Sequence, residues 1–279
     1  MPYLPRGWAS SLTQPQQQVW KRPDCNTAEG STNTACVLPA LNLELKPTPF
    51  AGPVTAAEDW IEKRLGVDVT LPMLKTAPAF SLFLNGVANS LILIVGALTA
   101  TFAFAIVFGF TLGSEFPPLR WLAWLMTMTL QSSPIVLTLV IAATFAHALL
   151  PYSASVALGA SILALGLTNG SNAGQAVSEA VVSLHREGRE KGMALFVHAL
   201  GRSAVSIVAF LINAAKGTPA ASFIGAPELL SALTDVSSFS SGRATIYCLV
   251  LIFYTLVVMI VVWACGGLRT WLEGREVTA

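Results

Sequence analysis

The sequence predicts an all-α membrane protein with about five transmembrane helices, and composition and charge distribution carry this prediction. Of the 279 residues, 54% are hydrophobic and only 11% are charged, whereas about a quarter of the residues in a soluble domain are charged. The mean hydropathy is +0.65. Asp, Glu, Lys and Arg are absent from residues 76–114, 121–178 and 244–268, and each run reaches the roughly 20 residues that cross a hydrocarbon core.

Each expected span has a recognisable end. The first stops at "SEFPPLR", whose paired prolines end a helix, the second stops at "PYS", and the third runs into the charged segment "HREGREKG". The polar segment "SALTDVSSFSSGR" precedes the last span. The expected spans are residues 84–113, 120–149, 153–178, 194–216 and 244–267.

The positive charges of the short loops predict the orientation. If the spans alternate, one side receives Arg120, then Arg186, Arg189 and Lys191, then Arg269 and Arg275, whereas the other side has little beyond Lys216 and Arg243. Basic residues favour the cytoplasmic side. We therefore expect "HREGREKG" and the carboxyl terminus in the cytoplasm and the amino terminus outside.

Three regions follow from this pattern. Residues 1–75 are expected to be poorly structured and extracytoplasmic, residues 76–272 to form the transmembrane domain, and residues 273–279 to form a short cytoplasmic tail. Residues 1–75 show no hydrophobic core of a signal peptide. Cys25 and Cys36 could form a disulfide outside the cell or remain two free thiols.

Polar and small residues occupy separate faces of the third span. At about 100° per residue, Thr168, Asn172, Gln175 and Glu179 share one narrow face. Gly166, Gly170 and Gly174 form a ridge on the opposite face, which lets another helix approach closely. One face therefore packs, and the other meets water or polar partners.

Similar polar faces recur on two other spans. Thr127, Gln131, Pro134 and Thr138 share a face of the second span, and Arg202, Ser206, Asn213 and Lys216 line up on the fourth. Ionisable residues inside a membrane are costly and usually mark a pathway. The alternative is hydrogen bonding between helices with no pathway at all.

Signals of catalysis and metal binding are missing. His147, His185 and His198 lack metal-ligand spacing, and neither an HExxH helix nor a GxSxG elbow is present. The absence of a GxxxxGK[ST] loop means that any ATP-driven work needs a partner. We expect no catalytic residue, no metal and no nucleic-acid partner.

The segment "LINAAKGTPAASFIGAPELL" resembles the signature of permease subunits of binding-protein-dependent ABC transporters for polar amino acids. The family pattern is "N..I.LLKDTSLASVIGVPEL". In this chain "KGTP" interrupts the fourth span, so the resemblance predicts a broken helix near residues 216–225. The alternative is a short extracytoplasmic turn that ends the fourth span. The matching residues are Lys216, Thr218, Ala221, Ser222, Ile224, Gly225, Pro227, Glu228 and Leu229.

The resemblance covers about residues 80–272 and includes departures from the family. "TLQSSPIVLTLVI" keeps Pro134 but has Gln131 where the family has Arg, and Gln175 stands where the family has Glu. "VVSLHREGREKGMAL" lies on the cytoplasmic EAA loop, with Glu190 on its glutamate. About a dozen residues of the family pattern are absent between Leu195 and His198.

The resemblance implies a multi-pass permease of the bacterial inner membrane that contacts lipid and carries polar amino acids. Its implied partners are ATPase subunits that bind ATP, a second permease subunit, the same or homologous, and an external solute-binding protein; no cofactor is expected on this chain. The two other readings are a channel or transporter outside the ABC class and a degenerate permease that acts as a membrane scaffold. The residues expected to border the solute pathway are Gln131, Pro134, Asn172, Gln175, Asn213, Lys216 and Thr218, and those expected to dock the ATPase are Ser183, Glu190 and Gly192.

Overall fold

The computed structural model describes residues 47–66, 69–188, 192–238 and 243–278, with side chains given up to residue 272. These residues belong to one compact unit that begins at Pro47. The described residues form helices and no named strand, which confirms the expected all-α class. Cys25, Cys36 and Glu190 lie outside the described residues.

Two helices precede the first span, within a segment expected to be poorly structured. Helix α3 covers Ala51–Leu65 and ends at Gly66, whose φ of 63° glycine adopts readily. The short α4 covers Pro72–Lys75. The buried Glu58 links the two helices, because its carboxylate accepts a hydrogen bond from the Leu71 amide at 2.7 Å and pairs with Lys75.

Helices α5, Ala77–Leu112, and α8, Ala154–Arg186, pack along the predicted glycine ridge. A Cβ added at Gly170 would lie 2.4 Å from the Cβ of Phe104, and one at Gly174 would lie 2.5 Å from the Cβ of Phe108. Gly166 meets Ala100 in the same way, at 2.5 Å. The ridge therefore contacts every fourth residue of α5, as expected for small residues at a helix interface.

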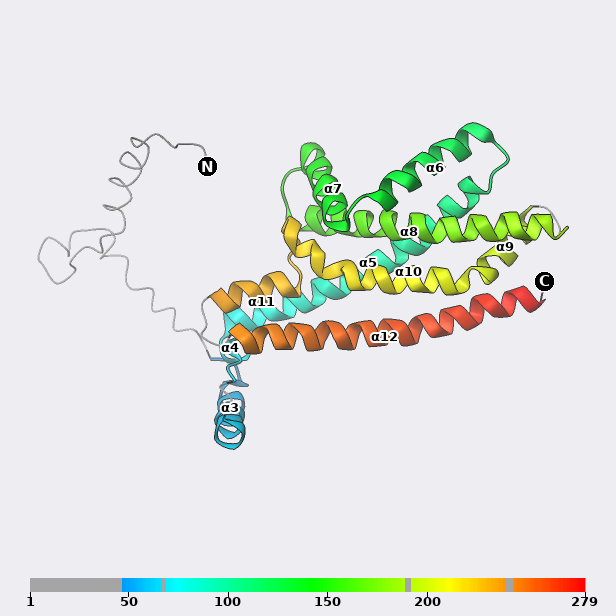
Figure 1. Ribbon diagram of the computed structural model, residues 1–279. Coiled ribbons are helices and arrows are strands. Elements are labelled where there is room, and N and C mark those ends of the chain that lie inside the picture. Colours follow the sequence, from blue (N-terminus) through cyan, green and yellow to red (C-terminus); the bar gives the residue numbers. More distant parts are fainter. Residues whose placement is uncertain (1–46, 67–68, 189–191, 239–242, 279) are drawn as a thin grey trace, which may run out of the picture. The chain divides into compact units, whose positions relative to one another are not determined.

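The second expected span, residues 120–149, is made of two helices. Helix α6 covers Pro117–Ser132, α7 covers Ile135–Leu149, and the two are bent by 116° (Figure 1). Ser133 is extended at the corner, and Pro134 lacks the amide hydrogen that would continue the helix. The sequence analysis matched Pro134 to the family pattern but did not predict this bend.

The fourth span is interrupted twice. Helix α9, Met193–Arg202, and α10, Ala204–Gly217, meet at Ser203, whose hydroxyl donates to the Ala199 carbonyl at 2.7 Å. After Gly217 the helix tightens into the 3-10 helix η2, Thr218–Ile224, and the chain turns at Gly225 with a φ of 77°. The expected interruption near 216–225 is therefore a change of helix type followed by a turn.

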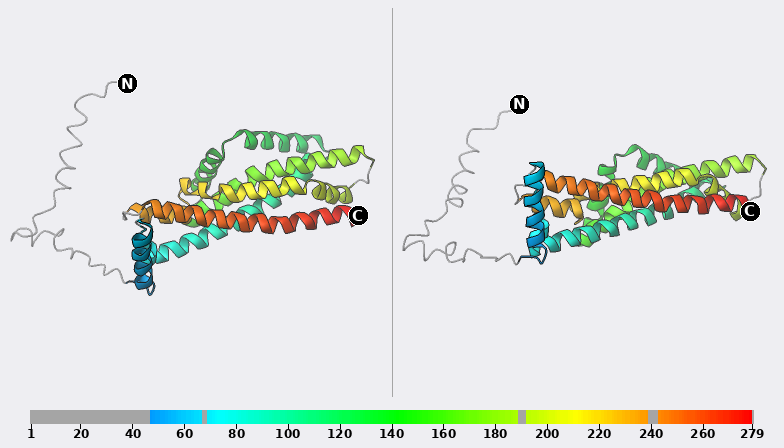
Figure 2. Two further views of the ribbon diagram at one scale, coloured as in Figure 1. Left: turned by 60° about the horizontal axis from the view of Figure 1, so that its bottom comes forward. Right: turned by 90° about the horizontal axis from the view of Figure 1, so that it is seen from below.

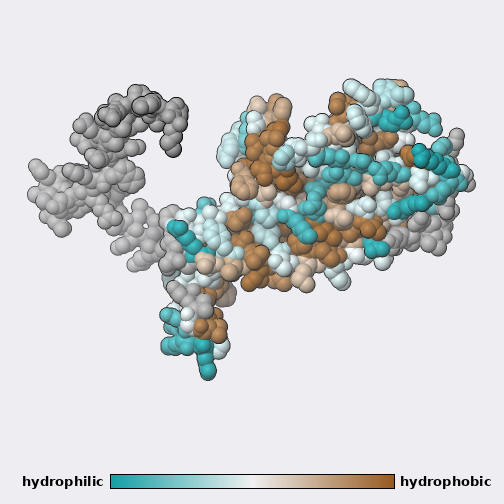
Figure 3. Space-filling view, viewed as in Figure 1, coloured by the Kyte–Doolittle hydropathy of each residue, from teal (hydrophilic) through white to brown (hydrophobic). Residues whose placement is uncertain are grey.

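Helices α11, Leu229–Ser238, and α12, Arg243–Thr278, complete the described chain. Helix α12 packs on α9, α10 and α11 (Figure 2) and continues as helix through the expected tail. In the part of the chain that the structure describes, four helices are long and apolar enough to cross a membrane, or five if the bent pair counts as one span. Together with the apolar residues on the surface in Figure 3, this describes a multi-pass membrane protein.

Candidate functional site

The predicted polar faces of α6 and α8 lie against each other. The side-chain amide of Gln131 donates to the side-chain oxygen of Gln175 at 2.5 Å, and Gln175 donates in turn to Glu179 at 3.0 Å. Because α8 is held by its glycines on α5, its opposite, polar face is free to meet α6. Both faces were predicted from helical spacing, but their direct contact was not.

One cavity lies on one side of this glutamine contact, and we name it the Lys216 cavity. Its volume is about 300 Å³. Four of the seven expected pathway residues, Gln131, Asn172, Asn213 and Lys216, line it together. It is lined from the α6–α7 corner by Gln131 and Ser133, from α8 by Thr168, Asn169 and Asn172, and from α10 by Asn213 and Lys216.

Amides and one ammonium group give the Lys216 cavity its chemistry. Lys216 is exposed, and no ion pair joins it to another residue in the described part of the chain. The Asn213 amide donates to the side-chain oxygen of Asn169 at 2.8 Å, which joins α10 to α8. Asn169 is 1% exposed and was missed by the sequence analysis, although it stands one turn before Asn172. The cavity therefore offers a positive charge beside neutral donors and acceptors.

A second cavity lies on the other side of the glutamine contact, and we name it the Arg120 cavity. Its volume is about 510 Å³. Gln175 lines this cavity and not the first. The lining residues from α6 include Arg120, Trp121, Trp124 and Thr127, and those from α8 are Gln175, Ser178 and Glu179.

Three residues expected on a polar face or along the solute pathway lie outside the two cavities. Thr218 is 0% exposed and donates to the Ala215 carbonyl at 2.8 Å, so it closes the end of α10 and lines neither cavity. Pro134 stands at the corner of the bent pair, between the cavity residues Ser133 and Ile135. Arg202 pairs with Glu187 at 2.8 Å, because the break at Ser203 separates it from the face that carries Lys216.

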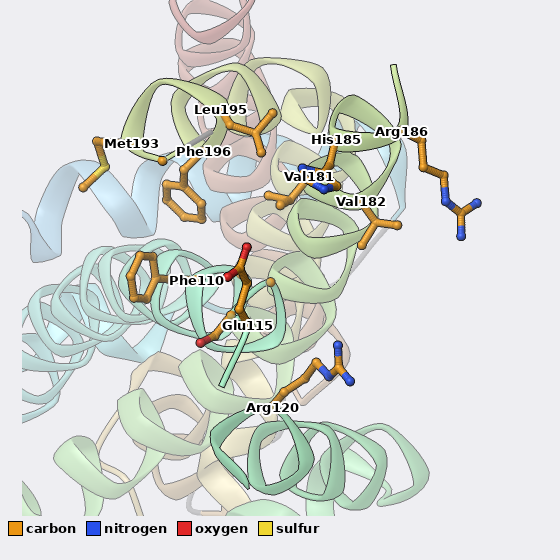
Figure 4. A pocket seen from close by; sticks show the side chains of 14 residues that line it. Phe110, Glu115, Arg120, Val181, Val182, His185, Arg186, Met193, Leu195 and Phe196 are labelled. Atoms are coloured by element: carbon orange, nitrogen blue, oxygen red, sulfur yellow. The ribbon is translucent and has the colours of Figure 1, made fainter. Parts of the chain in front are cut away.

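Two of the residues expected to dock an ATPase, Ser183 and Gly192, lie near the end of α8 and at the start of α9. The Ser183 hydroxyl donates to the Glu187 carboxylate at 3.3 Å, and Gly192 precedes α9 with a φ of 92°. Gly192 also lines a cavity of about 440 Å³, which we name the Phe196 cavity. Figure 4 shows Phe110 and Phe196 close together with Glu115 beside them, while the Arg186 side chain lies at the edge of the space and points away from it.

A buried carboxylate joins three helices next to the interrupted span. Glu228 is 0% exposed and accepts hydrogen bonds from the amides of Leu230 at 2.9 Å and Ser231 at 3.0 Å, which caps α11. The hydroxyls of Ser90 on α5 and Tyr254 on α12 also donate to it. Burial raises the pKa of the Glu228 carboxyl above its ordinary value, while these hydrogen bonds act to lower it.

Metal binding has no support among the described residues. No group of three or more His, Cys, Asp and Glu side chains gathers there in an arrangement that could hold a metal ion.

Comparison with known proteins identifies a similar fold. No family model matches this sequence, and no curated protein sequence matches it. Among solved structures, the fold is similar to a chain of "Crystal structure of an amino acid ABC transporter with histidines", with a TM-score of 0.50 and 15% sequence identity. The similarity covers 70% of this chain and 94% of that chain. The described part of this chain therefore has a fold similar to that of a chain of this amino acid ABC transporter.

Proposed function

We propose that this chain is the membrane-spanning permease subunit of an ATP-driven ABC transporter that carries polar amino acids across the bacterial inner membrane. The observation that carries the proposal is the Lys216 cavity, in a chain whose fold is similar to that of an amino acid ABC transporter. Three elements that are distant in sequence, the α6–α7 corner, α8 and α10, contribute polar residues to this cavity.

The lining of the Lys216 cavity suits the backbone groups of an amino acid. The Lys216 ammonium group attracts a carboxylate. The side-chain oxygens of Gln131 and Asn172 can accept hydrogen bonds from an α-ammonium group. A zwitterion that leaves water needs such replacements for its hydration shell, because unpaired burial of a charge is costly. Passage along this lining is therefore chemically reasonable.

Exposed polar residues on the faces of α6, α8 and α10 support the proposal that a second permease subunit binds there. Gln131, Asn213 and Lys216 are exposed in the single chain, although they lie within apolar helices. Lys216 lies within the candidate span Ala204–Ile224, and an ammonium group that faces lipid within a span is unfavourable. A second permease subunit, the same or homologous, would cover these faces and enclose a pathway between the two chains.

ATP hydrolysis is assigned to separate ATPase subunits, and the chain itself performs binding and passage. We place the ATPase contact in the cytoplasm, around the connection between α8 and α9, and assign it to Ser183, Glu190 and Gly192. The Phe196 cavity beside Gly192 offers apolar side chains together with Glu115 and Arg186, which suits a protein partner. An external solute-binding protein would deliver the amino acid from the opposite side.

Reconstitution tests this proposal. The chain is purified with its bound partners from its native membrane, and the complex is placed in proteoliposomes with ATP on the side of the ATPase. The expected result is ATP-dependent uptake of a polar amino acid supplied with the solute-binding protein. Uptake without ATP would favour a channel or a transporter outside the ABC class. An intact complex with ATPase activity but no uptake would favour the scaffold and contradict transport.

A further inference from the structure

The two cavities on the polar faces lie in series along the same pair of helices. On α8 the residues that line the Lys216 cavity end at Asn172, and those that line the Arg120 cavity begin at Gln175, about one turn later. On α6 the Arg120 cavity ends at Met128 and the Lys216 cavity begins at Leu130. The boundary on both helices is the hydrogen bond between Gln131 and Gln175, at 2.5 Å.

The two glutamines differ in how firmly they are held. Gln175 is fixed by its second hydrogen bond to Glu179, on a helix whose glycine ridge packs directly on α5. Gln131 lies in the last turn of α6, two residues before the corner at Ser133. Since Ser133 and Pro134 are not helical, α6 can move relative to α7 without breaking a helix. The contact between the glutamines can therefore open by movement of α6.

The chemistry of this boundary favours some amino acids over others. Both side chains are uncharged amides, so a charged side chain crossing the contact finds no opposite charge on either glutamine. The nearest carboxylate, that of Glu179, already accepts a hydrogen bond from Gln175 at 3.0 Å. On one side of the boundary Lys216 is the only charged residue among those described that line the cavity, and it repels a cationic side chain. A neutral polar side chain can exchange hydrogen bonds with both amides as it passes.

We propose that Gln131 and Gln175 form the constriction of the solute pathway and select amino acids whose side chains are polar and uncharged. This inference rests on the proposed transport function and adds the substrate class and the residues that determine it.

A reversible cross-link tests whether the contact is a constriction. Gln131→Cys and Gln175→Cys are combined in the full transporter after the native cysteines are replaced by alanine, and the pair is oxidised with copper phenanthroline. We expect oxidation to form a cross-link and to reduce L-glutamine uptake at least fivefold relative to the same variant before oxidation, a loss that dithiothreitol reverses. Oxidation should not change the uptake of a control variant that pairs Gln175→Cys with Thr129→Cys, each compared with itself before oxidation. Thr129 lies on α6 but lines neither cavity. A complete cross-link with unchanged uptake would overturn the constriction, as would no cross-link between two cysteines that both react with maleimide.

Competing substrates test the selectivity. The unmodified transporter should take up radiolabelled L-glutamine at least about tenfold faster than L-arginine or L-glutamate, a difference that corresponds to about 1.4 kcal/mol. Gln175→Glu should reduce the preference for L-glutamine over L-arginine by a similar factor. Ser132→Glu adds a carboxylate to the same end of α6 without lining either cavity and should leave the preference unchanged.

Outcomes of the two experiments separate this inference from the transport proposal. Faster uptake of L-arginine or L-glutamate by the unmodified transporter would overturn the selectivity while transport itself stands. An unchanged preference in Gln175→Glu would overturn the assignment to these glutamines. Absence of ATP-dependent uptake of every amino acid would overturn the transport proposal and this inference with it.

Discussion

The hydroxyl of Tyr254 on α12 donates a hydrogen bond to the buried carboxylate of Glu228, which caps the amino terminus of α11. Ser90 of α5 donates to the same carboxylate, at 3.4 Å, and accepts a hydrogen bond from the Leu229 amide at 2.9 Å. One side chain thus holds three helices together next to the turn that follows the interrupted span. We expect this cluster to contribute strongly to stability.

Glu228→Ala should destabilise the folded protein by about 2–3 kcal/mol, because it leaves the partly buried amides of Leu230 and Ser231 and the Tyr254 hydroxyl without their acceptor. Glu228→Gln retains one acceptor oxygen and should cost less. Tyr254→Phe removes one donor and should cost about 1 kcal/mol. Reversible unfolding in mixed micelles measures these differences, and equal stability of Glu228→Ala and the unmodified protein would contradict the role of the cluster.

Gly170→Ala should destabilise the packing of α8 on α5. The added methyl would lie 2.4 Å from the Cβ of Phe104 and 2.9 Å from the Thr101 carbonyl oxygen, so the helices must separate, at a cost of about 1–3 kcal/mol. Gly159→Ala is the matched control on the same helix, because its added methyl has no neighbour within 4 Å. The control should be neutral or slightly stabilising. Thermal unfolding of both variants in detergent checks the prediction, which a Gly170→Ala variant at least as stable as Gly159→Ala would refute.

Lys216→Ala should raise the KM for amino-acid uptake about tenfold, since it removes the positive charge that lines the Lys216 cavity. Lys216→Arg retains the charge and should recover part of the loss. Arg243→Ala serves as the control, because Arg243 is exposed at the start of α12 and lines neither cavity of the polar faces. The KM of each variant is measured from uptake kinetics in proteoliposomes. An unchanged KM in Lys216→Ala would mean that the solute pathway does not pass Lys216.

Cysteine labelling tests the orientation predicted from the basic loops. In a background without native cysteines, Ser183→Cys at the end of α8 should react with a membrane-impermeant maleimide only after the cells are opened. Ser238→Cys, which is exposed at the end of α11, should react in intact cells. Labelling of position 183 from outside, or of position 238 only from inside, would reverse the predicted orientation.

Local patterns in the sequence were sufficient to predict several features of the fold. The charge-free runs predicted the long apolar helices, and the spacing of Gly166, Gly170 and Gly174 predicted the face of α8 that packs. Asn172 and Gln175 were placed on the opposite, polar face by the same periodicity. These predictions succeed because a helix inside a membrane fixes which side chains share a face before any partner is known.

Tertiary structure alone decided how these faces meet. The bend of 116° at Pro134 brings Gln131 to Gln175, 44 positions later, and divides the polar faces into two cavities. Thr218 is buried and donates a hydrogen bond to a carbonyl at the end of α10. Glu228 accepts a hydrogen bond from Ser90, which lies 138 positions away in the sequence. Helical periodicity does not predict contacts between residues that are far apart in the sequence. The angle of a bend at a proline is not fixed by the sequence. The donors that bind a buried carboxylate depend on which helices pack around it.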